Sequence, residues 1–288
     1  MQSKFNEGRK ESNIPTVNVV RDGAKGDVFL VEPVLSQLAS QFKVNLSTKN
    51  PGIFEGNKHF SVNQNGVFDF TIDLNDCYEL TPKEHILNSY INKVEEVLKI
   101  KLAFKPPLIS FNKNEINLIN QLKKDPFVVI NIDPHQSYLS TRRVQGINVN
   151  QMADYIQTKY NLKVIEVGLN LDYGLSKVTL NNEREAMILI AASSLLIGLD
   201  SFLMHIASAL QKSAIAFFGS VDPNLRLFSN KNISIIQQKC ERQHCYHNSF
   251  HYGQYPCELN LSIPKCTISS NEEVFKYIDN HLKNSCDY

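Results

Sequence analysis

Asp27 ends a glycine-containing loop, and a carboxylate in that position could act as a general base in a cleft. The loop RDGAKGD (21–27) follows the apolar run Thr16–Val20, which is typical of a strand. A turn or helix-capping aspartate is the simpler interpretation of one sequence. Gly26 suits either close approach by a ligand or a tight turn, and the loop lacks the Gly-Lys-Ser/Thr ending of a P-loop.

A second candidate site follows the apolar run Leu195–Leu199, which ends at Asp200 and Ser201. The next segments have the composition of a helix (201–210) and a further strand (214–218), so the region predicts a βαβ unit in a parallel sheet. The N-terminus of such a helix presents free N–H groups at the ligand-binding edge of the sheet, where a phosphate fits. A plain helix cap is the alternative interpretation.

Other side chains of this helix and of an earlier loop could contribute to the same site. His205 lies one turn into the helix on the side of Ser201, although a half-buried helix histidine is the simpler interpretation, and Met204 is more typical of a core. Arg142 and Arg143 follow the expected strand 127–132 by about ten residues, after the loop DPHQSYLSTRR. Guanidinium groups match phosphate oxygens, and solvated loop arginines are an equal alternative.

Four of the six cysteines are confined to 27 residues, with the spacing C-x4-C-x11-C-x8-C: Cys240, Cys245, Cys257 and Cys266. In a reducing cytoplasm this clustering favours a tetrahedral thiolate site, with zinc or iron, over disulfides. The spacing does not match the paired C-x2-C elements of a zinc ribbon.

The elements that must position these residues form two α/β halves. Strands are expected at 16–20, 43–47, 69–74, 127–132, 163–167, 195–199 and 214–218, and helices at 85–98, 149–160, 183–193, 201–210 and 271–282, with a further helix that becomes regular near Pro33. We expect domains at 1–118 and 119–288, with a cysteine-rich segment at 240–266 and a cleft between the two doubly wound sheets.

Composition limits the partners. The net charge of the 288 residues is +1, and the basic residues form no stripe, so a small-molecule ligand is expected and a nucleic-acid surface is not. The amino terminus lacks the apolar core of a signal peptide, and the longest apolar run (186–199) is too short to span a bilayer. These features predict a soluble cytoplasmic protein without a transmembrane segment.

Taken together, these motifs resemble glycosyltransferase family 9, the ADP-heptose:lipopolysaccharide heptosyltransferases. The family has a Gly-Asp pair followed by an apolar stretch and a proline, and later an Asp-Ser/Thr-Gly-x-x-His-x-x-Ala-Ala segment leading to Gly-Pro-Thr-Asp-Pro. The corresponding residues here are Gly26, Asp27 and Pro33, then Asp200, Ser201, Phe202, His205, Ser208 and Ala209, then 219–223. The late segment is the specific part of the resemblance.

The resemblance implies a GT-B architecture, in which two Rossmann-like domains face a cleft and no catalytic metal takes part. The amino-terminal domain would bind the acceptor, and the carboxy-terminal domain would bind a nucleotide-diphosphate sugar. Asp27 would deprotonate the acceptor hydroxyl, the anomeric centre would be inverted, and Arg142 or Arg143 with the N–H groups of 201–203 would stabilise the departing diphosphate. Lysine is typical of the family in the arginine region.

Two departures from the family pattern leave the donor and the acceptor open. Phe202 replaces the glycine beside the diphosphate, where a ring could reshape the donor pocket, and the amino-terminal half is short. Donor-binding candidates are Gly26, Arg142, Arg143, Asp200, Ser201, Phe202, Met204 and His205. A glycan, a lipid-linked glycan or a protein could be the acceptor, and a homo-oligomer or peripheral association with the inner membrane is compatible with the family. A non-catalytic protein that binds nucleotide sugars is the alternative function.

Some family members that modify bacterial autotransporter proteins look similar in having a four-cysteine iron site. By this resemblance, the cysteine-rich segment would hold a structural metal. A redox or metal sensor is a further alternative for these cysteines.

Overall fold

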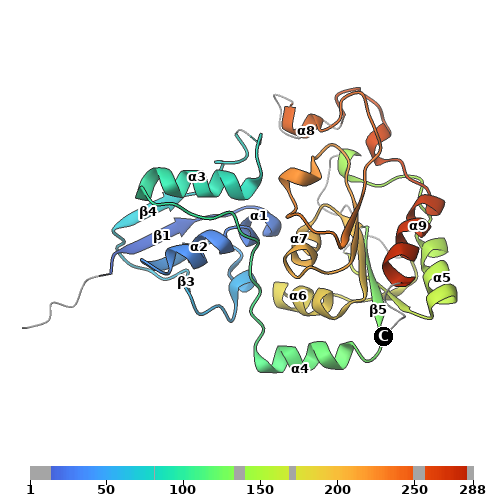
Figure 1. The fold of residues 1–288 in the computed structure, drawn as a ribbon, viewed down its shortest axis with the longest axis horizontal. Helices are drawn as coiled ribbons and strands as arrows, with labels where there is room; N and C mark the ends of the chain where they lie inside the picture. The colour runs from blue at the N-terminus through green and yellow to red at the C-terminus, as the bar shows by residue number, and fades with distance from the viewer. Residues whose placement is uncertain (1–13, 81, 133–139, 169–172, 249–256, 284–288) are drawn as a thin grey trace, which may run out of the picture.

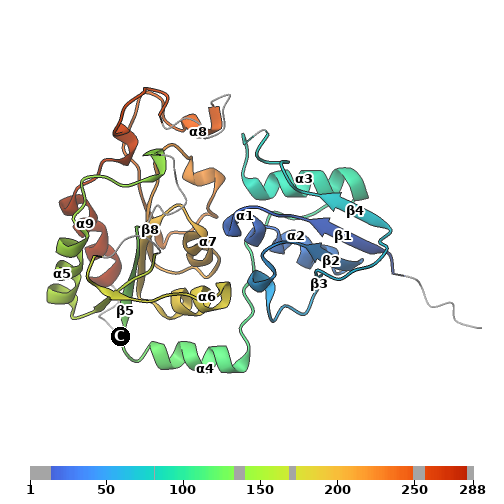
Figure 2. The ribbon, with the colours of Figure 1, turned by 180° about the vertical axis from the view of Figure 1, so that it is seen from behind.

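The computed structural model describes residues 14–80, 82–132, 140–168, 173–248 and 257–283. Figures 1 and 2 show two lobes, one built from the amino-terminal part of the chain and one from the carboxy-terminal part. The loop 133–139, which sequence analysis placed before the arginine pair, lies outside the described residues, as does Cys286.

The first lobe is built on a four-stranded parallel sheet in the order β3-β2-β1-β4. Its strands are β1 (Thr16–Val20), β2 (Lys43–Ser47), β3 (Ser61–Val62) and β4 (Phe70–Asp73). Its helices are α1 (Lys25–Phe29), α2 (Glu32–Leu38) and α3 (Ile86–Leu98), with a 3-10 turn at Pro51–Phe54. The strand order reverses between β1 and β4, and Asp27 lies in α1, the helix that follows β1.

The second lobe is built on a six-stranded parallel sheet in the order β10-β9-β8-β5-β6-β7. Its strands are β5 (Phe127–Asn131), β6 (Lys163–Glu166), β7 (Ser176–Lys177), β8 (Leu195–Leu199), β9 (Ala214–Phe217) and β10 (Ile233–Ile236). Its helices are α5 (Val149–Tyr160), α6 (Glu183–Ala192), α7 (Phe202–Ala209), α8 (Cys245–Asn248) and α9 (Asn271–Leu282), with 3-10 turns at Ser140–Arg142, Pro223–Leu225 and Lys265–Thr267. The order reverses between β5 and β8, and Asp200 follows β8.

Each sheet therefore has a candidate aspartate near its switch point, the place where the strand order reverses. In open parallel sheets, ligands bind outside the carboxyl ends of the strands where the strand order reverses, because the connections leave the sheet there toward opposite faces. Figure 1 shows α1 of the first lobe facing α7 of the second, which brings the two switch points toward each other. The two parallel α/β sheets agree with the GT-B fold expected from the sequence.

α4 (Lys113–Leu122) runs along the edge of the molecule from the first lobe to β5, as Figure 2 shows. Asn112 caps it in a capping box with Glu115, in which each side chain accepts a hydrogen bond from the other residue's backbone N–H. The expected division between residues 118 and 119 falls inside this helix, and the division into domains stays a prediction. Among the described helices, none is long and apolar enough to cross a membrane.

Candidate active site

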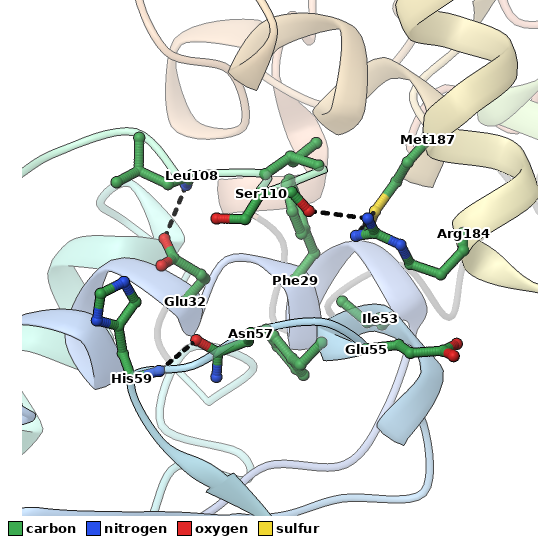
Figure 3. Close-up of a pocket in the computed structure, with 12 residues that line it drawn as sticks. Phe29, Glu32, Ile53, Glu55, Asn57, His59, Leu108, Ser110, Arg184 and Met187 are labelled. Atoms are coloured by element: carbon green, nitrogen blue, oxygen red, sulfur yellow. Dashed lines mark hydrogen bonds between the residues drawn. The ribbon is translucent and has the colours of Figure 1, made fainter. Parts of the chain in front are cut away.

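The large cleft between the two lobes has a volume of about 720 Å3. The first lobe contributes Gly26 and Asp27, and the second contributes Arg142, Asp200, Ser201, Phe202, His205 and Arg226, among others. A second pocket, under the segment that leads to α4, has a volume of only about 40 Å3 (Figure 3). Its Glu32 accepts a hydrogen bond from the Leu108 N–H, and a space of this size has room for a water or two and not for a sugar.

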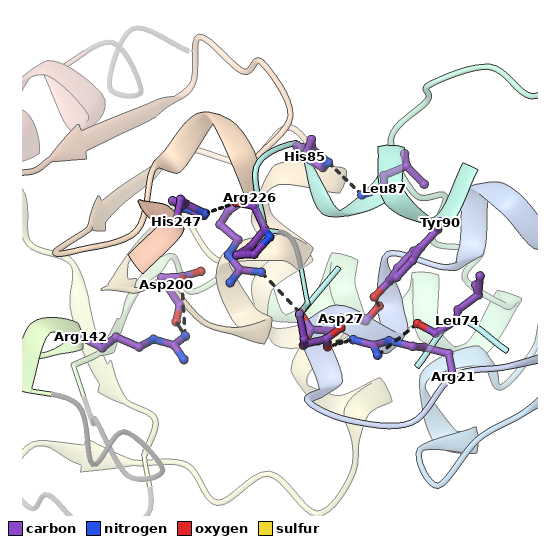
Figure 4. A network of polar contacts seen from close by, with 12 residues as sticks. Arg21, Asp27, Leu74, His85, Leu87, Tyr90, Arg142, Asp200, Arg226 and His247 are labelled. Atoms are coloured by element: carbon purple, nitrogen blue, oxygen red, sulfur yellow. Dashed lines mark hydrogen bonds and ion pairs between the residues drawn. The ribbon is translucent and has the colours of Figure 1, made fainter. Parts of the chain in front are cut away.

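Asp27 is held between two arginines. Its carboxylate lies 3.6 Å from Arg21 Nη2 and 3.8 Å from Arg226 Nη1, and its side chain is 23% exposed (Figure 4). Its backbone carbonyl accepts a hydrogen bond from the Tyr90 hydroxyl at 3.2 Å. The carboxylate lines the cleft, as a general base must, and the two arginines hold it in place.

Arg21 comes directly after β1 and is almost completely buried. Burial lowers its pKa, but Tyr90, Glu79 and Asp27 outweigh that effect and raise the pKa above its usual value, so the side chain is charged. Its guanidinium donates to Glu79 and to the Leu74 carbonyl. These bonds fix the cation against the carboxyl end of the first sheet.

Gly26 allows α1 to approach α7. A Cβ at this position would lie 2.7 Å from Cδ2 of His205, closer than real Cβ contacts. His205 is buried, and its Nδ1 has no hydrogen-bond partner among the described residues. Burial lowers the pKa of His205 against the raising effect of Asp200 and Asp27, so the ring is neutral near pH 7.

Asp200 and Ser201 lie at the N-terminus of α7, where the sequence predicts a phosphate site. The Ser201 hydroxyl donates to Asn131 Oδ1 at 3.2 Å, and no side chain caps the first N–H groups of the helix. These N–H groups therefore remain available to an anion. Arg142 donates to the Asp200 carbonyl at 2.7 Å, and its Nη2 lies 3.4 Å from the Asp200 carboxylate.

The Asp200 side chain is only 9% exposed. Burial raises its pKa, but Arg142 and Arg226 outweigh that effect, so the pKa lies below its usual value. The carboxylate is therefore ionised, and it forms the negative partner of two arginines that point toward the cleft (Figure 4).

Phe202, which stands where the resembling family has glycine, packs toward the first lobe. Its ring meets that of Phe29 in α1 edge to face, with ring centroids 5.9 Å apart. The residue lines the cleft, but the ring also forms part of the contact between α1 and α7.

Two of the candidates from the sequence lie outside the cleft lining. Arg143 is exposed, whereas its neighbour Arg142 lines the cleft. Met204 is fully buried in the core beneath α7, as its alternative interpretation expected. The roles of the site residues stay predictions.

Arg226 also lines the cleft but is not among the residues expected from the sequence. It follows the 3-10 turn Pro223–Leu225, and its guanidinium lies over the rings of Tyr78 and Tyr246, with distances of 4.8 and 5.4 Å to the ring centroids. The Asp-Pro pair that ends the family-like segment could have directed attention to the loop, but not to this arginine. Its importance depends on Tyr78 and Asp27, which are about 150 to 200 residues earlier in the chain.

The four clustered cysteines lie in the segment that leads into and out of α8. Burial and, to a smaller extent, the nearby thiols of Cys240, Cys245 and Cys257 together raise the pKa of Cys266 to about 12. All four are free thiols and lie within electrostatic range of one another. In the described part of the chain, however, no three Cys, His, Asp or Glu side chains have the arrangement of a metal site.

The same segment contacts the cleft and the first lobe. Tyr246 lines the cleft, and the His247 ring lies between the two lobes, where Nδ1 is 2.7 Å from the Pro82 carbonyl oxygen. Nε2 of His247 accepts from the Asp222 N–H at 2.9 Å, so the proton of the neutral ring is on Nδ1 and is donated to Pro82. The cysteine-rich segment is thus tied to both halves of the site.

Part of the chain matches the sequence model of one protein family. Residues 175–255 match the model of Glycosyltransferase family 9 (heptosyltransferase), and no curated protein sequence matches the chain. The matched region runs through β8, α7 and β9 and includes the candidates Asp200, Ser201, Phe202, Met204 and His205, whereas Gly26, Arg142 and Arg143 lie outside it.

Solved structures of glycosyltransferases share the fold. A family 9 glycosyl transferase from Veillonella parvula DSM 2008 is 16% identical, with 96% of this chain and 100% of that chain covered and a TM-score of 0.68. TibC, an iron-containing dodecameric glycosyltransferase from enterotoxigenic E. coli H10407, is 15% identical, with 94% and 76% covered and a TM-score of 0.67. TibC has also been solved in complex with ADP-D-beta-D-heptose.

ADP-heptose lps heptosyltransferase II from E. coli is 12% identical, with 94% of this chain and 99% of that chain covered and a TM-score of 0.61. At such identities the likeness shows the fold. The resemblance to glycosyltransferase family 9 is thus confirmed, in sequence over residues 175–255 and in fold over nearly the whole chain, and it supports a glycosyl-transfer function.

Proposed function

We propose that the chain is an inverting glycosyltransferase that transfers a heptose or a hexose from a nucleotide-diphosphate donor. The acceptor would be a glycan, a lipopolysaccharide or other lipid-linked glycan, or a protein. One observation carries the proposal. Asp27 of the first lobe and the uncapped N-terminus of α7 in the second lobe open into one cleft of about 720 Å3. A base and an anion site on opposite sides of a cleft are what displacement at an anomeric carbon requires.

The donor's diphosphate would bind at the start of α7. The free N–H groups after Ser201, the positive end of the helix and Arg142 supply charge there. Asn131 holds the Ser201 hydroxyl, and Arg142 holds Asp200, so the site is ordered before a ligand enters it. Preorganised donors of this kind stabilise a leaving group more effectively than water does.

Asp27 would take the proton of the acceptor hydroxyl. As that proton is transferred, the acceptor oxygen forms a bond to the anomeric carbon, and the bond from that carbon to the phosphate oxygen breaks. The diphosphate leaves with the bonding electron pair, and attack from the opposite face inverts the anomeric centre. No metal ion enters these steps.

A binding screen tests the proposal. We expect at least one nucleotide sugar among ADP-heptose, UDP-glucose, GDP-mannose and their close analogues to raise the unfolding temperature of the full chain, because a ligand that binds only the folded state stabilises it. At a hundredfold excess over Kd the expected stabilisation is about 3 kcal/mol. No response to any nucleotide sugar would contradict the proposal, and binding without transfer to any acceptor would favour a non-catalytic binding protein.

We also propose that Cys240, Cys245, Cys257 and Cys266 hold a structural zinc or iron ion. Four free thiols within electrostatic range of one another are a suitable ligand set, since thiolates bind either metal tetrahedrally. Elemental analysis of the purified protein is expected to find about one metal ion per chain, and a chelator is expected to lower the unfolding temperature. Metal-free protein with four reactive thiols would contradict this assignment.

A further inference from the structure

Arg226 has donor groups in the cleft that the protein itself does not use. Its side chain is 10% exposed, and its guanidinium makes no hydrogen bond within the described residues. Nε is buried without a partner, and the ion pair to Asp27, at 3.8 Å, is too long for a hydrogen bond. A guanidinium has five N–H donors, and leaving them unpaired in a buried position is costly.

The surroundings keep this guanidinium charged and in place. Burial lowers the pKa of Arg226, but Tyr78, Asp200 and Asp27 outweigh that effect and raise it above its usual value. The rings of Tyr78 and Tyr246 lie against the guanidinium from different lobes. Aromatic faces stabilise an arginine by cation–π attraction without using its N–H groups.

Arg226 lies between the candidate base and the candidate phosphate site. Figure 4 shows its guanidinium between Asp27, the candidate base, and Asp200, at the start of the candidate phosphate site. Arg142, the other arginine of the cleft, is already bonded to Asp200. Of the two arginines that line the cleft, Arg226 is the one whose guanidinium makes no hydrogen bond to the described residues.

We infer that Arg226 binds the donor's diphosphate through its guanidinium fork, at the phosphate next to the sugar. Two oxygens of that phosphate would accept hydrogen bonds from the fork, which matches phosphate geometry. The same guanidinium forms the 3.8 Å ion pair with Asp27, and a bound diphosphate would replace that contact. This inference rests on the proposed function, because it assumes a nucleotide-diphosphate ligand.

The affinities of a nucleoside diphosphate and its monophosphate test the inference. Calorimetric titration of the full chain with ADP and AMP, and with the UDP and GDP pairs, identifies the nucleoside that binds best. We expect the wild type to bind the diphosphate at least tenfold more tightly than the monophosphate. Arg226→Gln is expected to lose most of this preference while its monophosphate affinity stays within about twofold.

Two further variants keep the result interpretable. Arg226→Lys retains the buried charge but loses the fork, so an intermediate loss of diphosphate affinity is expected even if Arg226→Gln is poorly folded. Lys101→Gln removes one positive charge from an exposed pair with Glu95 and is expected to leave both affinities unchanged.

The outcomes separate the inference from the function on which it rests. Wild-type affinity for the diphosphate in folded Arg226→Gln or Arg226→Lys would overturn the inference, even if transfer were impaired, because Arg226 would then act only through Asp27. Failure of the wild type to bind any nucleoside diphosphate would instead contradict the proposed function.

Discussion

Asp27, Gly26 and His205 show how closely the two halves of the site depend on each other. The His205 ring fills the space beside Gly26, so the helix with the candidate base rests on the helix with the candidate phosphate site. Motif and spacing predicted Asp27, Asp200 and Ser201, because each follows a strand. They could not predict Arg21 or Arg226, because contacts far apart in the sequence, Glu79 for one and Tyr78 for the other, hold these arginines in place.

Gly26→Ala tests this dependence. The added Cβ would lie 2.7 Å from the His205 ring, which is buried and must move. We expect a loss of about 1–3 kcal/mol in the free energy of unfolding, together with weaker nucleotide-sugar binding. Denaturant titration and calorimetry measure the two effects.

Gly66→Ala is the matched control. A Cβ there would meet only the Phe68 ring, at 3.8 Å, which is ordinary contact. Equal losses of stability in the two variants would show that the packing of Gly26 against His205 is unimportant.

At the scale of elements, the sequence located the buried segments well. The expected strands at 16–20, 43–47 and 195–199 and the helices at 149–160 and 271–282 have the predicted bounds. Apolar residues at strand spacing, a continuous apolar run or a regular helical apolar face defines each of them. The strands β3, β7 and β10 were not predicted. All three lie at sheet edges, and β3 and β7 have only two residues each, which is too short for a recognisable pattern.

The helix after β1 shows a second limit. The regular helix expected near Pro33 is confirmed as α2, which begins at Glu32, but the sequence did not predict the separate helix α1, which ends at Phe29. Pro33 lies in the first turn of α2, where proline is favoured, and so it marks the start of the second helix. The break directs α1 across the cleft toward α7, a tertiary contact that no local pattern encodes.

The contact between α1 and α7 includes an aromatic pair that can be measured. Replacing Phe29 and Phe202 by leucine, singly and together, removes the edge-to-face contact while keeping apolar side chains. The double-mutant cycle is expected to give a coupling energy of about 0.5–1.5 kcal/mol in favour of the native pair. A coupling energy near zero would mean that Phe202 does not join the lobes, and its ring would then be free to reshape the donor pocket.

At the scale of the whole molecule, buried histidines tie the two lobes together. His85 caps α3, since its Nδ1 accepts a hydrogen bond from the Leu87 N–H, and its ring packs against Phe104 and against Phe228 of the second lobe. Burial and, to a smaller extent, the electrostatic effects of His205 and Arg226 together lower the pKa of His85 to about 4. The folded protein therefore binds fewer protons at this site than the unfolded chain between about pH 6.5 and 4.

The free energy of unfolding should therefore decrease as the pH is lowered through this interval. The contribution of His85 is fully present above about pH 6.5 and is lost as the pH falls toward 4, with a total of about 3 kcal/mol. His85→Asn keeps an oxygen that can cap α3 but removes the titrating ring. Unfolding free energies between pH 7.5 and 4.5 should fall less steeply for this variant than for the wild type, and parallel curves would rule out His85 as the cause.

The whole-molecule account finally depends on Asp27 acting as a base on a donor bound by the other lobe. The most direct measurement is the transfer rate and the donor affinity of Asp27→Asn with the nucleotide sugar that the wild type uses. We expect transfer to fall by at least about a hundredfold, since general bases contribute 10²–10⁴-fold, while the donor Kd stays within a few-fold of the wild-type value. A transfer rate equal to that of the wild type would contradict the account.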